Sequence, residues 1–276
     1  MSNVFPLKAQ TEDLPLGLSV IVPVYNESSR ICEALCELVS VDVNFPFEII
    51  VINDGSSDNT KDIIQWPMHL LHIRFIDLPE NKGKGNAVRL GIKMAEYSHA
   101  LVFDADLEYF GHDIPRLFRP IQMGVASIVY GVRLRGVNSM HPSFIFALGR
   151  RVLTAITNIL YGTAISDLHT CLKLFPVDFL RTIELTESGF GLDTQMTALA
   201  LRNQLKPFEI PITYVGRTAS EGKKIKFSHA FECVFILIRC RFSKPLGYQV
   251  KKYAKRNINF VLQRLDPIYI AYEDFV

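Results

Sequence analysis

Apolar residues in the first half of the chain occur in short runs that alternate with stretches of helical spacing. Leu18–Val24 and Phe47–Ile52 are continuous and rich in β-branched residues, a pattern that predicts strands buried on both faces of a parallel sheet. Ile73–Asp77, Ala100–Phe103 and Ser127–Gly131 predict three further strands. The first half of the chain is therefore expected to form one sheet of five strands.

Amphipathic segments separate these strands. Glu27–Val39 carries apolar residues at helical spacing, Thr60–Gln65 predicts a short helix, and Gly85–Tyr97 predicts a second amphipathic helix. Strands that alternate with helices predict a doubly wound α/β sheet. Such a sheet binds its ligands beyond the carboxyl ends of its strands, so functional residues are expected in the loops that follow the strands.

The second half of the chain is less regular. Cys171–Phe175 and Pro211–Tyr214 predict short strands, and Thr194–Asn203 predicts a helix between them. Phe144–Tyr161 and Phe227–Phe242 predict two long and strongly apolar helices. No internal repeat or linker is visible. We expect an N-terminal extension over residues 1–16, one domain over 17–242 and a basic C-terminal tail over 243–276.

Composition narrows the classes of function. Apolar residues make up 49% of the 276 residues, enough for a sizeable core, and the net charge of +2 is too small for a general nucleic-acid binder. The five cysteines are scattered and predict reduced thiols in a cytoplasmic protein. Neither a signal peptide nor a run of about 18 apolar residues is visible. We therefore expect a protein that is soluble or bound to a membrane surface without crossing it.

Asp104 and Asp106 directly follow the fourth predicted strand. The regular alternation of a strand ends where the strand ends. We expect the chain to turn at this point and to bring both carboxylates to one ligand. Two adjacent carboxylates repel, and a divalent cation such as Mg²⁺ or Mn²⁺ relieves that repulsion. An isolated pair of this kind is more often a pair of solvated loop acids, but the buried strand before it favours a metal site.

Two further loops could contact a nucleotide. Asp54 follows the second strand, where its carboxylate could accept a hydrogen bond from a base or ribose, or could cap the next helix. The segment Asn81–Asn86 precedes a helix and contains two glycines, which let the backbone approach a ligand at a helix start that favours anions. Each of these signals is weak by itself.

Seven motifs in a fixed order are more specific than any one of them. They are Val22–Glu27, Asn53–Asp58, Asn81–Gly85, Asp104–Glu108, Tyr130–Arg133, Ser166–Lys173 and Arg217–Ile225. In order and spacing they resemble family 2 glycosyltransferases, above all the dolichyl-phosphate mannose synthase-like branch that includes polyprenyl-phosphate glucosyltransferases. The resemblance covers 18–242. It implies the GT-A fold, a Rossmann-like and mostly parallel central sheet flanked by helices, here with C-terminal amphipathic helices.

The resemblance also implies which residues bind the nucleotide sugar. The residues expected to contact it are Pro23, Tyr25, Glu27, Asp54, Lys82, Gly83, Asp104, Ala105 and Asp106. Asp104, Asp106 and Glu108 would hold the metal, Mg²⁺ or Mn²⁺. The mannose synthases often carry Gln at the third of these positions, so Glu108 adds a charge that could alter the preference for metal or donor.

An acceptor site is implied in the same way. The residues expected to bind phosphates of the donor or the acceptor are Arg133, Arg217, Lys223 and Lys224. The expected catalytic residues are Asp106, Arg133 and Asp167, with Asp167 near the acceptor. Relatives usually carry an acidic residue directly after the phenylalanine at position 190, where this chain has Gly191. Either Asp193 serves instead, or the acceptor pocket differs here.

These residues favour an inverting transferase that moves a hexose from a nucleotide sugar, of the GDP-mannose or UDP-glucose type, to a polyprenyl (dolichyl or undecaprenyl) phosphate. A phosphate acceptor is already anionic near neutral pH, so catalysis would depend on alignment and charge stabilisation. Transfer to a soluble saccharide or another hydroxyl would require Asp167 or Asp193 as general base. The non-enzymatic alternative is an idle nucleotide-sugar-binding protein, and the retained motif residues argue against it.

The C-terminal sequence is consistent with a membrane-bound acceptor. Eight basic residues and no acidic residue occur between Arg239 and Arg264, and near an anionic leaflet each could contribute roughly 1 kcal/mol. The apolar segment before them, and Phe144–Tyr161 with Arg150 and Arg151, suit peripheral attachment at the cytoplasmic face of a membrane. The alternative is that both helices pack on the domain and that the charges form a solvated face.

Overall fold

The computed structural model describes residues 14–71, 73–134, 138–140, 144–189, 191–217 and 228–243. They form a seven-stranded sheet in the order β3-β2-β1-β4-β7-β5-β8. Its strands are β1 (Leu18–Val24), β2 (Phe47–Asn53), β3 (Ile73–Asp77), β4 (His99–Val102), β5 (Val129–Val132), β7 (Lys173–Pro176) and β8 (Phe208–Pro211). β7 runs antiparallel to its neighbours β4 and β5, and the other pairings are parallel. A small second sheet pairs β6 (Ser139–Met140) with β9 (Tyr214–Val215).

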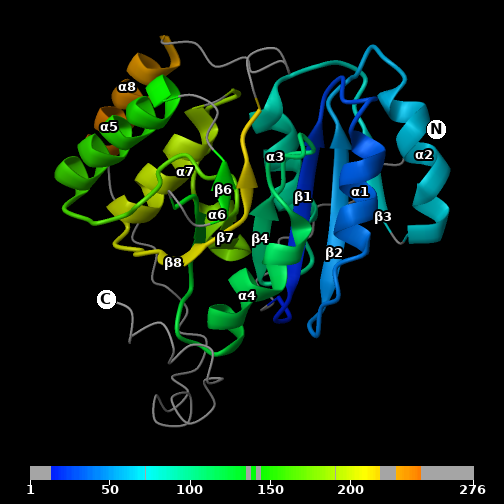
Figure 1. Ribbon diagram of the computed structural model, residues 1–276, viewed down its shortest axis with the longest axis horizontal. Coiled ribbons are helices and arrows are strands. Elements are labelled where there is room, and N and C mark those ends of the chain that lie inside the picture. The colour runs from blue at the N-terminus through cyan, green and yellow to red at the C-terminus, as the bar shows by residue number, and fades with distance from the viewer. Residues whose placement is uncertain are drawn as a thin grey trace.

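Helices surround the large sheet. They are α1 (Ile31–Val39), α2 (Thr60–Leu71), α3 (Lys84–Met94), α4 (Ile114–Gln122) after the short 3-10 turn η1 (Gly111–Asp113), α5 (Phe144–Tyr161), α6 (Val177–Thr182), α7 (Gly191–Arg202) and α8 (Ser228–Phe242). Figure 1 shows α1 and α2 beside β1–β3, whereas α5, α7 and α8 are grouped at the other end of the sheet. The predicted fold class, a mostly parallel sheet flanked by helices, is confirmed.

Burial on both faces explains the uninterrupted apolar run of β1. Leu18, Val20 and Val22 belong to the core that includes α1 and α4, whereas Ile21 belongs to the core that includes α3. All four side chains are fully buried. Because successive side chains point to opposite faces of a strand, each helix layer receives its own set of β1 side chains.

The irregular second half contains β6 and α6, which were not predicted from the sequence, and it departs from the prediction at one expected strand. The prediction of a strand over Pro211–Tyr214 was wrong, because β8 ends at Pro211 and β9 begins at Tyr214 in the other sheet. Proline has no N–H to donate to a ladder, so it marks the end of this strand rather than its start. Most of the predicted extension over 1–16 and of the tail over 243–276 lies outside the described residues, so the division into these regions stays a prediction.

α5 and α8 pack against each other, and α8 also packs on α7. Both helices nevertheless turn large apolar side chains outward, each at least 45% exposed. We call this set the outer apolar face: Phe144, Ile145, Leu148, Val152 and Ile159 of α5, with Phe231, Phe235, Ile238 and Phe242 of α8. The apolar stripe of α5 therefore points away from the core, and the residues that it buries include Thr154 and Thr157.

We expect Gly91→Val to lower the free energy of unfolding by about 1–3 kcal/mol, the usual cost of overpacking a core. A Cβ at Gly91 in α3 would lie 2.4 Å from Cγ2 of Ile21 and 3.0 Å from Cδ1 of Ile52. Gly149→Val in α5 is the matched control, because a Cβ there meets nothing within 4 Å. Urea denaturation should show a clear loss for the first variant only; equal losses would contradict the packing described for α3.

Candidate active site

The loops that follow β1, β2 and β3 are tied together around Asp54. Its N–H donates to the Val24 carbonyl (2.8 Å), and its Oδ1 accepts the N–H of Lys82 (3.1 Å). Gly55, with φ +64°, allows the backbone of Glu80 to approach so closely that a Cβ would lie 2.4 Å from its carbonyl carbon. These loops leave the sheet beside the switch point between β1 and β4, where open α/β sheets bind ligands.

Asp104 and Asp106 lie just beyond the carboxyl end of β4. The strand ends at Val102, and the chain then turns through Leu107, whose φ of 60° lies in the left-handed region. The N–H of Glu108 donates to Asp106 Oδ1 (3.1 Å) and holds the turn. The chain therefore turns at this point, as expected, and the residue with positive φ follows the second acid.

Asp104 is paired with a lysine that the sequence did not single out. The Lys84 ammonium donates to both Asp104 oxygens (2.8 and 2.9 Å) and lies 3.7 Å from Asp193. The Cys171 thiol also donates to Asp104, at 3.0 Å. Asp104 thus meets side chains from α3 and from the loop before β7, while Lys84 reaches on to α7.

Asp106 is paired with Arg217. The Arg217 guanidinium donates to Asp106 Oδ2 (2.6 Å), and its Nε donates to Glu108 Oε1 (3.2 Å). Glu108 also accepts the Arg217 N–H (3.0 Å) and the Tyr214 hydroxyl (2.9 Å). Glu108 is buried, and its contacts anchor Arg217 above Asp106.

The two acids have opposite pKa shifts. Burial opposes ionisation of Asp104, but the Lys84 charge holds the pKa of Asp104 below its usual value. Burial, and then the charge of Asp104, raise the pKa of Asp106 to about 7. Burial would lower the pKa of Lys84, yet the charges of Asp104 and Asp193 raise it well above its usual value. Asp104 is therefore ionised at neutral pH, whereas Asp106 is only partly ionised.

The chemistry of this cluster fits a hard divalent cation. Four acids, Asp104, Asp106, Glu108 and Asp193, meet two bases, Lys84 and Arg217, in direct ion pairs. Two negative charges are formally left over, and carboxylate oxygens are ligands that Mg²⁺ and Mn²⁺ prefer. No group of three metal-binding side chains is preassembled among the described residues. The predicted third ligand, Glu108, instead has both oxygens engaged by Tyr214 and Arg217.

Arg133 and Asp167 form a buried pair rather than two separate groups. Nε and Nη2 of Arg133 donate to the two Asp167 oxygens at 2.7 and 2.8 Å. The Arg133 guanidinium also lies over the rings of Tyr109 and Tyr214, 5.8 and 4.9 Å from their centres. Burial opposes ionisation of Asp167, but Arg133 lowers the pKa of Asp167 to about 2. Asp167 is therefore a poor general base.

A cavity of about 90 Å³ lies beside this pair; we call it the arginine cavity. Its lining residues are Arg133, Leu134, Ala147, Arg150, Arg151, Thr154 and Ser166. Arg150 approaches the same Asp167 carboxylate at 3.7 Å, and Glu209 accepts hydrogen bonds from Ser166. Three arginines line the cavity, and the only acids described beside it are Asp167, which pairs with Arg133 and Arg150, and Glu209, which contacts Ser166; the formal charge of these five groups is +1. Arg150 and Arg151 were absent from the predicted phosphate-binding set.

The remaining predicted donor residues lie around the switch point. Tyr25 is exposed after β1, Pro23 lies within that strand, and Glu27 pairs with Arg30 at 3.4 Å. Ala105 is buried between the two aspartates. Lys223 and Lys224 lie outside the described residues.

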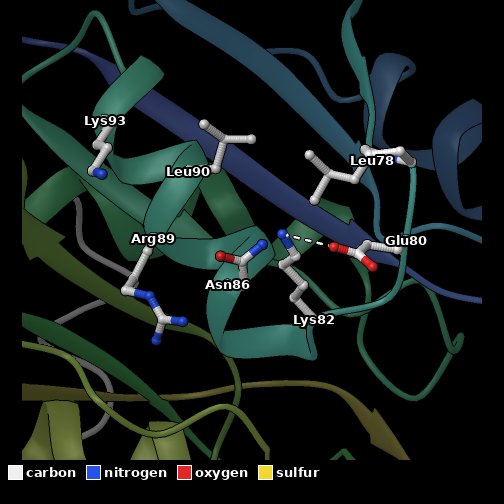
Figure 2. A pocket seen from close by; sticks show the side chains of 8 residues that line it. Leu78, Glu80, Lys82, Asn86, Arg89, Leu90 and Lys93 are labelled. Atoms are coloured by element: carbon white, nitrogen blue, oxygen red, sulfur yellow. Dashed lines mark ion pairs between the residues drawn. The ribbon is translucent and has the colours of Figure 1, made fainter.

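Lys82 contacts Asp54 through its backbone, while its side chain turns elsewhere. Figure 2 shows the Lys82 ammonium directed to Glu80 (2.9 Å), in a pocket of about 260 Å³ on the outer side of α3. Gly83 has φ +89° and precedes the first residue of α3. The lysine of this segment that contacts the acid pair is Lys84, two residues on, and no sequence pattern ranked it above Lys82.

His169 joins the loop before β7 to two helices. Its Nε2 lies 3.2 Å from the Thr194 hydroxyl of α7 and 3.4 Å from the Cys233 thiol of α8. Burial, and then the nearby Lys173, lower the pKa of His169 to about 4. A neutral imidazole therefore connects the loop of Asp167 and Cys171 to the helices behind it.

A family model for glycosyl transferase family 2 matches residues 19–183, more than half of the chain. The chain belongs to this family. The match spans the strands and loops that carry Asp54, Asp104, Asp106, Arg133 and Asp167. The predicted family is therefore confirmed, and with it the expectation of a glycosyltransferase.

Two curated relatives match most of the chain. A dolichyl-phosphate beta-glucosyltransferase of Trichomonas vaginalis is 28% identical over 253 residues, which cover 85% of this chain and 76% of that protein. A dolichyl-phosphate beta-glucosyltransferase of Dictyostelium discoideum is 28% identical over 249 residues, which cover 83% and 75%. Both match well beyond the family model.

The fold also matches solved structures. Glucosyl-3-phosphoglycerate synthase from Mycobacterium tuberculosis, solved with Mn²⁺, UDP and glucosyl-3-phosphoglycerate, has a TM-score of 0.61. The two chains are 16% identical, and the match covers 82% of this chain and 80% of the synthase. At this identity the likeness shows the fold alone, which agrees with the predicted GT-A architecture.

We expect His169→Gln to reduce the acid sensitivity of the fold. Unfolded histidine takes up a proton near pH 6.5, whereas folded His169 does so only near its pKa of about 4. Stability from this group is therefore present above pH 6.5 and is lost as pH falls towards 4. Urea denaturation at several pH values should show a smaller loss between pH 6.5 and 4 in the variant than in the wild type. Parallel curves would contradict a buried neutral His169.

Proposed function

We propose that this protein is an inverting hexosyltransferase that transfers a sugar from a nucleotide sugar to a polyprenyl phosphate, with Mg²⁺ or Mn²⁺ bound at Asp104 and Asp106. The observation that carries this proposal is the arginine cavity. One of its walls is α5, whose other side carries exposed apolar residues. A site for an anion therefore lies next to a surface suited to a lipid chain.

The donor is proposed to bind in the loops around Asp54 and the acid pair. A bound divalent cation would supply positive charge for the departing diphosphate. Asp104 and Asp106 offer carboxylate oxygens for such an ion. Arg217, fixed by Glu108, would add a guanidinium that can bind phosphate oxygens. Lys223 and Lys224 stay proposed phosphate ligands from the sequence motif alone.

The acceptor phosphate is proposed to bind in the arginine cavity. Arg150 and Arg151 reach it from α5, and Arg133 reaches it from the end of β5. A contact chain joins this cavity to the acid pair: Asp167 to Arg133, Arg133 over the Tyr214 ring, Tyr214 to Glu108, and Arg217 between Glu108 and Asp106. Direct side-chain contacts thus connect the arginine cavity to the acid pair.

Among the described residues, the two acids expected to serve as general base for a hydroxyl, Asp167 and Asp193, both lie beside cations, and this favours a phosphate acceptor. A hydroxyl must lose its proton to a base as it attacks. Asp167 is held at low pKa by Arg133, and Asp193 lies near the Lys84 ammonium. An ionised phosphate needs no such base. Its oxygen would form the bond to the anomeric carbon as the bond from that carbon to the diphosphate breaks on the opposite side, which inverts the centre. Asp167 then acts by positioning Arg133.

Membrane contact is proposed through the outer apolar face, at the cytoplasmic side. Of the described helices, α5 alone is long and apolar enough to cross a membrane by length and composition. Its Arg150 contacts the buried Asp167, however, and the helix packs on α8. Contact with the membrane surface satisfies both observations, because α5 can stay in the fold while its exposed side chains enter the lipid. The two dolichyl-phosphate relatives support a lipid-linked acceptor.

We expect short-chain polyprenyl phosphate to stimulate release of nucleoside diphosphate from UDP-glucose or GDP-mannose in the presence of Mn²⁺ or Mg²⁺. Asp106→Ala should lower turnover by about 100-fold or more, as loss of a preorganised electrostatic group does. Arg150→Met should raise KM for the polyprenyl phosphate by about 10-fold, the cost of one charge-assisted hydrogen bond, with little change in KM for the donor. Stimulation by a soluble saccharide alone would overturn the proposal.

We expect the full chain to float with vesicles that contain anionic lipid. Phe231→Ser combined with Phe235→Ser should reduce the bound fraction by at least about 10-fold, because each buried Phe side chain contributes about 1.5–3 kcal/mol. Phe208→Ser is the control, since Phe208 is also exposed but lies on β8, outside the outer apolar face. Equal flotation of the double variant and the control would argue against this face.

A further inference from the structure

The Lys84 ammonium occupies the position next to Asp104 that an incoming cation would need. It contacts both oxygens of that carboxylate, at 2.8 and 2.9 Å, and lies 3.7 Å from Asp193. A carboxylate held on both oxygens by an ammonium has a weakened attraction for a second cation, since the two cations repel. Lys84 and a divalent ion therefore compete for Asp104.

The backbone around Lys84 is built to aim its side chain at this place. A Cβ on Gly85 would lie 1.9 Å from the Glu187 carbonyl oxygen, and a Cβ on Gly83 would lie 2.7 Å from the Ser188 carbonyl oxygen. The Gly85 N–H donates to that same Ser188 carbonyl at 3.0 Å. Only glycine permits so close an approach. The two glycines thus press the start of α3 onto residues 187–188, and Lys84 between them projects towards Asp104 and Asp193.

Lys84 also lies where a diphosphate would arrive. It is the first residue of α3, at the positive end of that helix dipole, and its side chain is 27% exposed. An ammonium at such a position can turn from a carboxylate to a phosphate oxygen by rotation of its side chain alone. The carboxylate that it leaves is then open to a metal ion.

We propose that Lys84 is a resident counter-cation of the donor site, which holds Asp104 when the site is empty and turns to the donor diphosphate when nucleotide and divalent ion bind together. This inference rests on the proposed function, because it assigns a binding role within the same donor site. It makes metal and nucleotide binding mutually dependent. The metal alone must displace Lys84 from Asp104, whereas the nucleotide supplies Lys84 with a new anionic partner.

The test is to measure binding of Mn²⁺ and of UDP or GDP to the full chain by calorimetry, without any acceptor. Lys84→Met removes the charge and keeps the length of the side chain. Without nucleotide, we expect this variant to bind Mn²⁺ about 10-fold more tightly than the wild type, the effect of one charge-assisted hydrogen bond. With saturating Mn²⁺, it should bind the nucleotide that the wild type prefers about 10-fold more weakly. The stimulation of Mn²⁺ binding by nucleotide should fall correspondingly.

Lys93→Met is the matched control, since Lys93 lies on the same helix and forms no described ion pair with Asp104. It should leave the Mn²⁺ affinity unchanged. Lys84→Arg keeps the charge and should bind Mn²⁺ alone as weakly as the wild type. If Lys84→Met does not fold, Lys84→Gln gives the same comparison with a neutral donor to Asp104.

Unchanged or weaker Mn²⁺ binding by folded Lys84→Met would overturn the inference and leave Lys84 a structural ion pair. So would unchanged nucleotide affinity in that variant. These outcomes do not depend on the acceptor. A protein that shows the expected Mn²⁺ and nucleotide effects but no response to polyprenyl phosphate would support the role of Lys84 and refute the proposed acceptor.

Discussion

Mutual repulsion of Asp104 and Asp106 is the constraint around which the site is arranged. Two carboxylates in a poorly solvated turn can both ionise only if positive charge is close. The fold brings Lys84 from the start of α3 to one of them and Arg217 from the segment after β9 to the other. Burial opposes ionisation of both acids, but the Lys84 charge lowers the pKa of Asp104, whereas the charge of Asp104 raises the pKa of Asp106 further. The proposed donor site is thus charge-balanced only in part, which would favour binding of a divalent ion.

A second consequence of this arrangement is that the same contacts reach the arginine cavity, the proposed acceptor site. Glu108 holds Arg217 with one oxygen and Tyr214 with the other, and the Tyr214 ring faces Arg133. Arg133 in turn fixes Asp167, which also attracts Arg150. Residues that the sequence suggested as separate ligands are in fact members of one network. A substitution at Glu108 should therefore disturb both halves of the site.

The sequence carried enough information for the sheet, its first five strands and the four polar loops, because apolar runs and helical spacing are local patterns. Its family motifs also named Asp54, Asp104, Asp106, Arg133 and Asp167. It could not rank Lys84 above Lys82, because only the tertiary contact of Gly83 and Gly85 with residues 187–188 sets the direction of the side chain. Nor could it predict the contacts of Glu108, because the partners Tyr214 and Arg217 are more than 100 residues away in the sequence.

β7 has the opposite direction to β4 and β5 on either side of it. A reversed strand presents its beginning where its parallel neighbours present their ends, so residues 166–172 arrive at the same rim as Asp104 although they precede a strand. This places Cys171 within hydrogen-bond distance of Asp104, which lies in the proposed nucleotide site. Insertions or substitutions in that single connection would therefore change the proposed acceptor site while the framework around Asp54 keeps its shape. One inverted strand thus allows the two proposed binding sites to vary independently.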